Sequence, residues 1–200
     1  MKKHIPISLI VFRLILAPTI LGLVYFLREE SRFSVLILMY LGLISDILDG
    51  IIARQLNVSS SRFRRFDSQT DMIFWLSIGI STWLLYPNLI RNNSIPIVII
   101  FIMEGMCYMI SIIKFRKETC THAFLSKIWG ITLLAAFTSL IGFNHAGIPF
   151  ILAIIFGLIS HVDRILITLI LPTWTHDIPS FYHAYLMKKG VNFKSNKLLN

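Results

Sequence analysis

Residues 46–71 decide how this chain is organised, and they read DILDGIIARQLNVSSSRFRRFDSQTD. The stretch holds four carboxylates, at Asp46, Asp49, Asp67 and Asp71, in a chain that is otherwise strongly apolar. A carboxylate near the hydrocarbon of a bilayer costs about 3 kcal/mol on insertion scales, so acids at such positions are candidates for a functional site. Four of them in one stretch indicate a site for cations.

The composition is that of an integral membrane protein. Of the 200 residues, 56% are hydrophobic and only 14% are charged, and the mean hydropathy is +0.73. A soluble domain has about a quarter of its residues charged. Since a membrane span needs about 20 apolar residues, we expect an all-α, polytopic protein with about six transmembrane helices. These helices should form a single domain over residues 1–200, with a polar tail at about residues 172–200.

Apolar segments separated by short polar or turn-forming connections place the spans. The first segment continues past Leu27 without a small-x-small cleavage site, so we interpret it as a retained span and not as a secretory signal. Within it, Arg13 lies about a turn and a half inside and Pro18 lies near the middle. The predicted spans cover residues 7–27, 33–53, 67–86, 95–113, 124–143 and 147–171.

Basic residues alternate between the two sides, and cytoplasmic connections retain Lys and Arg. One side is strongly basic and comprises Lys2, Lys3, the loops 54–65 and 114–127, and a tail with Lys188, Lys189, Lys194 and Lys197. The other side holds only Arg28, Arg32 and Arg91. We therefore expect both termini in the cytoplasm and the carboxylates at the cytoplasmic face, in the inner membrane of a bacterium. The net charge of +9 favours membrane lipids and phosphate-bearing substrates, not nucleic acid, as partners.

Helical spacing can bring the four acids together. Asp46 and Asp49 are three residues apart and Asp67 and Asp71 are four apart, so each pair shares one helix face. The connection between the two helices is short enough to make them neighbours. Carboxylate oxygens suit hard cations, and four carboxylates can hold a pair of ions that clamp a pyrophosphate.

Residues beside the acids favour a phosphate-bearing ligand. Gly50 lies on the face of Asp46, and Ala53 extends that face by a turn, which leaves room for a ligand between helices. Arg54 and the other arginines of the 54–65 loop offer guanidinium forks to phosphate oxygens.

This order of residues resembles the signature of the CDP-alcohol phosphatidyltransferases, D-x-x-D-G-x-x-A-R, eight or nine residues, then G-x-x-x-D-x-x-x-D. The matching positions are Asp46, Asp49, Gly50, Ala53, Arg54, Asp67 and Asp71. Arg13 and Pro18 also look like the first-helix Arg and Pro of this family. Phe63 departs from the pattern, because it stands where the family has the glycine of the second motif. Glycine permits close backbone approach or an unusual turn, so the local loop geometry should differ.

The resemblance implies an enzyme of phospholipid synthesis. Asp46, Asp49, Asp67 and Asp71 would hold two divalent ions, Mg²⁺ or Mn²⁺, at the pyrophosphate of a CDP-lipid such as CDP-diacylglycerol. Asp71 would take the proton from a small alcohol acceptor, and CMP would leave. The chain is also expected to form a homodimer. The residues implied to contact the CDP-lipid are Gly50, Ala53, Arg54, Ser60 and Arg13.

The acceptor alcohol stays open, because glycerol 3-phosphate, inositol phosphate and serine share this donor chemistry. The basic 114–127 loop tilts the prediction toward a phosphorylated acceptor. Candidate acceptor-binding residues are Lys114, Arg116, Lys127 and Arg164. A cytoplasmic loop retains such residues without any further function, so a purely topological role is the alternative.

Other interpretations stay open for the polar residues of the spans. The aspartates could be structural ion-pair partners of Arg54, Arg64 and Arg65. They could also line the path of an ion or solute transporter, which predicts acids or broken helices near the bilayer midplane. Arg13 either binds phosphate or extends to the cytoplasmic headgroups. Glu104 either faces the site or pairs with a basic neighbour.

Asp163 and Arg164 are adjacent in the last span, so they should point apart and find different partners. Together with His161 they either line the acceptor pocket or make structural contacts to another span. The tail is interpreted as an interfacial amphipathic segment. Its aromatic residues and histidines are Trp174, His176, Phe181, Tyr182, His183 and Tyr185.

Overall fold

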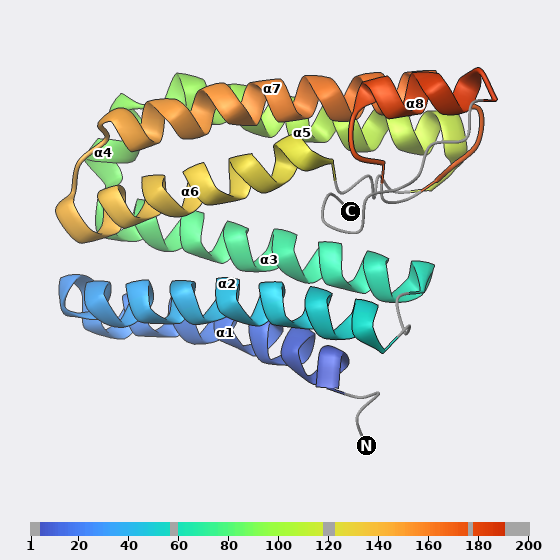
Figure 1. Ribbon diagram of the computed structural model, residues 1–200. Helices are drawn as coiled ribbons and strands as arrows, with labels where there is room; N and C mark the ends of the chain where they lie inside the picture. Colours follow the sequence, from blue (N-terminus) through green and yellow to red (C-terminus); the bar gives the residue numbers. More distant parts are fainter. Residues whose placement is uncertain (1–4, 57–59, 118–122, 176–177, 191–200) are drawn as a thin grey trace. The chain divides into compact units, whose positions relative to one another are not determined.

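The computed structural model describes residues 5–56, 60–117, 123–175 and 178–190 (Figure 1). Every regular element in these ranges is a helix, and none of the described residues forms a strand. The all-α fold class predicted from the sequence is therefore confirmed.

The chain divides into two compact units. One comprises Met1–Asn92 with Phe137–His145, and the other comprises Asn93–Ala136 with Ala146–Asn200. Helix α6, Phe124–Phe143, contributes its last residues to the first unit and its earlier residues to the second. The single domain predicted for the whole chain stays a prediction.

The first unit is built around helix α1, Ile5–Leu27. This helix packs along both α2, Arg32–Gln55, and α3, Ser61–Leu85, whereas α2 and α3 contact each other much less. Groups on α2 and α3 can therefore be joined through side chains that α1 supplies.

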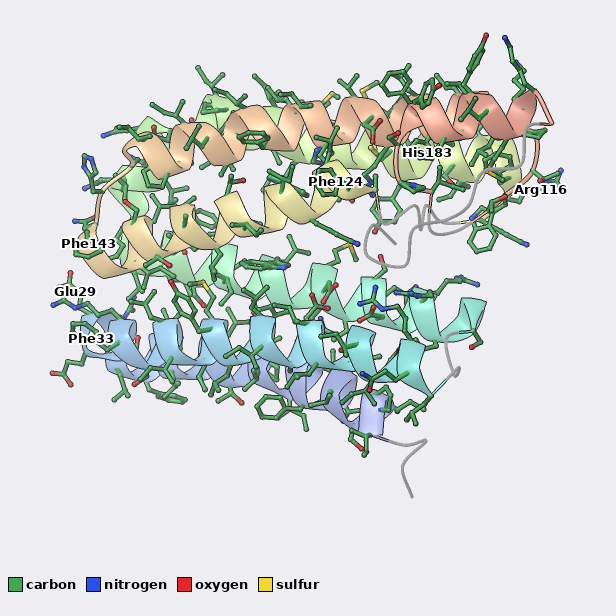
Figure 2. The ribbon with its side chains drawn as sticks, viewed as in Figure 1. Glu29, Phe33, Arg116, Phe124, Phe143 and His183 are labelled. Carbon is green, nitrogen blue, oxygen red and sulfur yellow. The ribbon has the colours of Figure 1, made fainter. Side chains whose placement is uncertain are left out.

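A short 3-10 turn, η2 (Arg28–Ser31), connects α1 to α2, and a short helix, α4 (Pro87–Asn92), follows α3. Glu29 and Phe33 lie at the η2 end of the first unit, and both are exposed (Figure 2). The polar connection predicted between the third and fourth spans therefore contains a short helix, α4.

The buried face of α1 follows the helical repeat. Ile10, Arg13, Ala17, Ile20 and Val24 are three or four residues apart, and all are nearly inaccessible to solvent. Such spacing places them on one stripe of the helix. Arg13 therefore belongs to the packed face of α1 although it is charged.

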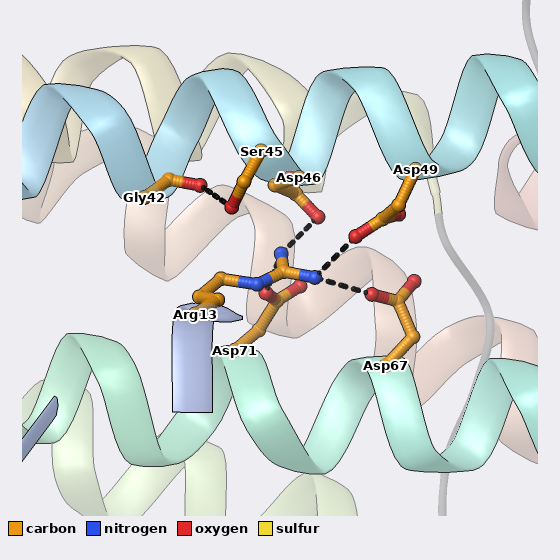
Figure 3. Close-up of polar contacts among 7 residues, drawn as sticks. All are labelled: Arg13, Gly42, Ser45, Asp46, Asp49, Asp67 and Asp71. Carbon is orange, nitrogen blue, oxygen red and sulfur yellow. Dashed lines mark hydrogen bonds and ion pairs between the residues drawn. The ribbon is translucent and has the colours of Figure 1, made fainter. Parts of the chain in front are cut away.

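A close contact fixes how α2 and α3 face each other. Phe74 of α3 is buried, and a Cβ placed on Gly42 of α2 would lie 2.2 Å from Cζ of its ring. Asp46 lies one turn after Gly42, and Asp71 lies one turn before Phe74. The contact therefore brings the acidic turns of the two helices level with each other (Figure 3).

In the second unit, α5 (Ser94–Phe115) packs on α7 (Ile148–Ile170), and α7 packs on α8 (Phe181–Lys188). Oδ1 of Asp163 accepts a hydrogen bond from the backbone N–H of Phe181 at 2.9 Å, which ties the start of α8 to α7. A small apolar core supports this end of the unit and consists of Ala123, Ile167, Leu171, Ile178 and Ala184.

Long apolar helices support an integral membrane protein. Within the described residues, 4 stretches are long and apolar enough to cross a membrane. The first, Ile5–Gln55, has 51 residues and contains both α1 and α2, which is more than one span needs. The remaining stretches are Ser94–Phe115, Phe124–Phe143 and Ile148–Ile170.

The count of six spans and the cytoplasmic position of the termini stay predictions. Helix α3 is not among the apolar stretches of the described chain, although its 25 residues are long enough for a span. Several residues that the orientation argument used lie outside the described residues, namely Lys2, Lys3, Lys194 and Lys197.

Helix α3 begins earlier than predicted. We expected a loop up to Phe66, but the helix starts at Ser61 because Ser60 is its N-cap and accepts a hydrogen bond from the backbone N–H of Phe63 at 3.2 Å. Arg64 and Arg65 therefore lie in the first turns of α3 and not in a loop.

Candidate active site

Four aspartates converge on the guanidinium of Arg13 (Figure 3). Its Nη2 donates to Oδ2 of Asp49 at 2.6 Å and to Oδ1 of Asp67 at 2.8 Å. Its Nη1 donates to Asp46 and to Asp71. The structure thus brings together the acids that the sequence singled out, and α1 supplies the cation that joins them.

The cluster is closed on one side and open on the other. The side chains of Arg13 and Asp49 are 1% and 0% exposed, and that of Asp67 is 6% exposed. Those of Asp46 and Asp71 are 36% and 31% exposed. A ligand that reaches the site therefore meets Asp46 and Asp71 first, while Asp49 and Asp67 form its floor.

The cluster is short of positive charge. With all four carboxylates ionised, the guanidinium of Arg13 and that of the buried Arg64, which interacts electrostatically with Asp49 and Asp67, leave a formal charge of 2 − 4 = −2. Among the described residues, Oδ1 of Asp49 and Nε of Arg13 are buried and have no hydrogen-bond partner. Buried charge is strongly unfavourable unless it is compensated, so the site has the capacity for further cations.

The donor set fits a divalent metal ion. Asp46, Asp49 and Asp67 each offer one carboxylate oxygen, and these oxygens lie within 4.8 Å of one another. Mg²⁺ binds oxygen at about 2.0–2.1 Å, so two ligands on opposite sides of an ion are about 4 Å apart. The carboxylates are therefore spaced almost closely enough to share one ion. Carboxylate oxygens are hard ligands, which Mg²⁺ and Mn²⁺ prefer.

A model of the CDP-alcohol phosphatidyltransferase family matches residues 3–173 of this chain. The chain belongs to that family. A CDP-diacylglycerol--glycerol-3-phosphate 3-phosphatidyltransferase of Aquifex aeolicus (strain VF5) is 39% identical over 71 residues, which cover 36% of this chain and 38% of the relative. The chain thus matches well under half of that relative's length. No solved structure matches the chain.

CDP-alcohol phosphatidyltransferases generally depend on divalent metals, and the aspartate cluster offers this member a place to bind one. Of the residues expected to contact the CDP-lipid, Gly50 has open space where a Cβ would point. Ala53 differs, because it is 1% exposed and packs with Ile10 and Phe63. The room expected beside Ala53 is therefore filled, and Phe63, which stands at the family's glycine position, helps to fill it.

The two other candidates for CDP-lipid contacts lie at the ends of the acidic helices. Arg54 is exposed in the last turn of α2. Ser60 is also exposed, and its hydroxyl caps α3, so it has a structural role whether or not it contacts a nucleotide. Their contacts to a CDP-lipid stay predictions.

Arg13 does not extend to the headgroups, and that alternative is wrong. Its side chain is buried on the packed stripe of α1 and binds all four acids. The stripe spacing of Ile10, Arg13 and Ala17 was the signal for burial, because apolar neighbours three or four residues away define the packed face. Sequence reasoning missed that Arg13 itself is the ion-pair partner of the aspartates.

The candidate acceptor-binding residues lie in the second unit. Nζ of Lys114 donates to the backbone oxygens of Thr168 and Leu169 at 3.1 and 2.6 Å, so it caps the C-terminal end of α7. Arg116 is exposed at the end of α5 (Figure 2), and Lys127 is exposed on α6. Acceptor binding by these residues stays a prediction.

Arg164, the fourth candidate, pairs with Glu104 through two hydrogen bonds of 2.7 and 3.1 Å. Nε2 of His161 lies 2.7 Å from Oε2 of Glu104, although not in hydrogen-bonding geometry. Of the two alternatives left open for Glu104, the structure shows the pairing with a basic neighbour. Asp163 binds the start of α8 instead, so the adjacent Asp163 and Arg164 do point apart.

The tail segment interpreted as interfacial contains helix α8. In α8, Phe181, Tyr182 and Tyr185 are exposed, and Lys189 lies over the ring of Tyr185 at 4.7 Å. These features are typical of a segment at a membrane interface. His176 lies outside the described residues.

Proposed function

We propose that this chain transfers a phosphatidyl group from CDP-diacylglycerol to an alcohol and releases CMP. The observation that carries the proposal is the convergence of four aspartates from α2 and α3, in the order of the family signature, within a chain that matches the family model over residues 3–173. Glycerol 3-phosphate is the proposed acceptor, since the name of the Aquifex aeolicus relative includes it.

Two divalent ions, Mg²⁺ or Mn²⁺, are proposed to bind Asp46, Asp49, Asp67 and Asp71. Bound there, they would supply the positive charge that offsets the negative charge of the pyrophosphate as the leaving group departs. The support in this chain is the formal charge of −2 on the cluster, with Arg13 and Arg64 counted, and the unpartnered Oδ1 of Asp49.

The residues of the cluster divide the remaining work. Asp71, one of the two more exposed acids, is proposed to accept the proton of the acceptor hydroxyl. The hydroxyl oxygen then forms a bond to the lipid-side phosphorus, and the bond from that phosphorus to CMP breaks. The open space at Gly50 lets the donor's phosphates approach α2, and the exposed Arg54 offers them a guanidinium fork.

The active site is proposed to face the cytoplasm from the inner membrane of a bacterium. The CDP headgroup of the donor is water-soluble, whereas its diacylglycerol part stays in the bilayer, so a site at the interface serves both parts of the donor. Transport predicts acids or broken helices near the bilayer midplane, and it is less favoured because the helices that carry these acids are continuous. Asp46 and Asp49 lie within the continuous helix α2, and Asp67 and Asp71 lie within α3.

The experiment is CMP release by the purified protein from CDP-diacylglycerol, with Mg²⁺ or Mn²⁺ and a panel of alcohols that includes glycerol 3-phosphate. Asp67→Asn should lower CMP release by about 100-fold or more, because it removes a ligand from the floor of the site. Glu29→Gln is the control, since it removes an equal charge from an exposed carboxylate at the η2 end (Figure 2).

Circular dichroism and gel filtration would establish that the Asp67→Asn protein is folded. Wild-type CMP release by that folded variant would refute the proposed mechanism. Wild-type protein that turns over none of the alcohols would refute the proposed activity.

A further inference from the structure

Arg13 lies in the space that the metal ligands share. Its guanidinium extends from α1 into the gap between the acidic turns of α2 and α3 (Figure 3). Both terminal nitrogens are engaged, Nη1 with Asp46 and Asp71 and Nη2 with Asp49 and Asp67. Helices α2 and α3 thus each provide one carboxylate to each of the two nitrogens.

A guanidinium in this position and a divalent ion compete for the same carboxylates. Nη2 is 2.6 Å from Oδ2 of Asp49 and 2.8 Å from Oδ1 of Asp67. An ion bound by Asp46, Asp49 and Asp67 would need lone pairs directed into the same space, at about 2.0–2.1 Å from each oxygen. The two positive charges of the ion would also repel the positive charge of the Arg13 guanidinium. The contacts of Arg13 therefore oppose the binding of a divalent ion by these carboxylates.

We propose that Arg13 is the built-in counter-cation of the metal-free site, and that divalent ions bind as Arg13 withdraws from the four carboxylates. This inference rests on the proposed metal site. Its consequence is that Arg13 weakens metal binding, because the apparent affinity is reduced by the fraction of protein in which the carboxylates are free. The freed guanidinium is then available to phosphate oxygens, which is the role predicted for Arg13 from the sequence.

The second consequence concerns stability. Without Arg13, four carboxylates would lie together with only Arg64, which interacts electrostatically with Asp49 and Asp67, to offset their charge. An unpaired buried charge is strongly destabilising. Metal-free protein that lacks Arg13 should therefore unfold at a lower temperature than the wild type, and Mn²⁺ should reduce that difference.

The test is Mn²⁺ binding to purified protein without substrate, followed by loss of the free-Mn²⁺ signal in electron paramagnetic resonance. We expect Arg13→Gln to bind Mn²⁺ about tenfold or more tightly than the wild type, which corresponds to carboxylates that are free in a tenth of the wild-type molecules or fewer. Arg65→Gln is the matched control. Arg65 is exposed on α3, two residues before Asp67, so its loss removes the same charge and leaves the four contacts of Arg13 in place.

Arg13→Lys keeps the proposal testable if Arg13→Gln does not fold. A lysine keeps the charge, but its single ammonium nitrogen cannot replace two nitrogens that each bind two acids, so Mn²⁺ affinity should lie above that of the wild type. Equal Mn²⁺ affinity of the wild type and the folded Arg13 variants would overturn the proposal. So would an equal gain in Arg65→Gln.

These outcomes are separate from failure of the proposed function. If the wild type and the Arg13 variants bind Mn²⁺ equally, and Asp67→Asn abolishes that binding, the metal site stands and only the role of Arg13 falls. If neither the wild type nor the folded Arg13 variants bind Mn²⁺, the metal part of the proposed function falls, and the role of Arg13 falls with it.

Discussion

The contact between Gly42 and Phe74 predicts that a single methyl group will disturb the active-site helices. Gly42→Ala would place a Cβ 2.2, 2.7 and 2.9 Å from three carbons of the Phe74 ring. Non-bonded carbons are most favourably about 3.5–4.0 Å apart, so the ring or the helices must shift by about 1 Å or more. Phe74 is 1% exposed, so its ring has little free space into which it can move.

The expected cost follows from two opposing terms. Overpacking of a close-packed core costs about 1–3 kcal/mol, and three short contacts place Gly42→Ala in the upper part of that range. Alanine is about 1 kcal/mol more favourable than glycine within a helix. We therefore expect the free energy of unfolding to fall by about 1–2 kcal/mol in Gly42→Ala.

Gly22→Ala in α1 is the matched control, because no atom lies within 4 Å of the position of its added Cβ. It should be neutral or stabilising by up to about 1 kcal/mol. Thermal unfolding in detergent compares both variants with the wild type, and Phe74→Leu in the Gly42→Ala background should recover part of the loss by relieving the contact. Gly42→Ala as stable as Gly22→Ala would refute the packing argument.

Two further predictions concern the second unit. Glu104→Ala leaves the guanidinium of Arg164 without its carboxylate, and should lower the free energy of unfolding by about 1–3 kcal/mol, less than for a fully buried pair because Glu104 is partly exposed. An unchanged thermal midpoint would contradict this. Asp163→Ala removes the acceptor for the N–H of Phe181, costs about 1 kcal/mol, and should speed hydrogen exchange in α8. Asp163→Asn keeps an acceptor oxygen and should exchange like the wild type; equal exchange in both variants would argue against the cap.

The acidic pairs were predictable because their spacing is local. Residues three or four apart share a helix face whatever the rest of the chain does. The sequence therefore indicated that Asp46 and Asp49 would project together, as would Asp67 and Asp71. The start of α3 was less predictable, since three serines in a row offered several possible N-caps and only the structure selects Ser60.

The contacts of Arg13 depend on how three helices pack, and spacing within one helix does not determine this. Asp46 and Asp71 lie 33 and 58 residues from Arg13. A similar limit applies to Ala53. Its small side chain was interpreted as space for a ligand, but Ile10 and Phe63 pack against it, and only the tertiary structure reveals which neighbours fill a gap.

The position of Arg13 also explains why α1 is central to the first unit. Ionised carboxylates whose oxygens lie within 4.8 Å of one another repel each other by about 3.5 kcal/mol per pair or more at an effective dielectric constant of about 20. Helices α2 and α3 contact each other sparsely, so their own packing does little to offset four such charges. Helix α1 packs along both and carries a cation on the same buried stripe as its apolar contacts. One helix therefore supplies both the packing that holds α2 and α3 together and the charge that lets their acidic turns meet.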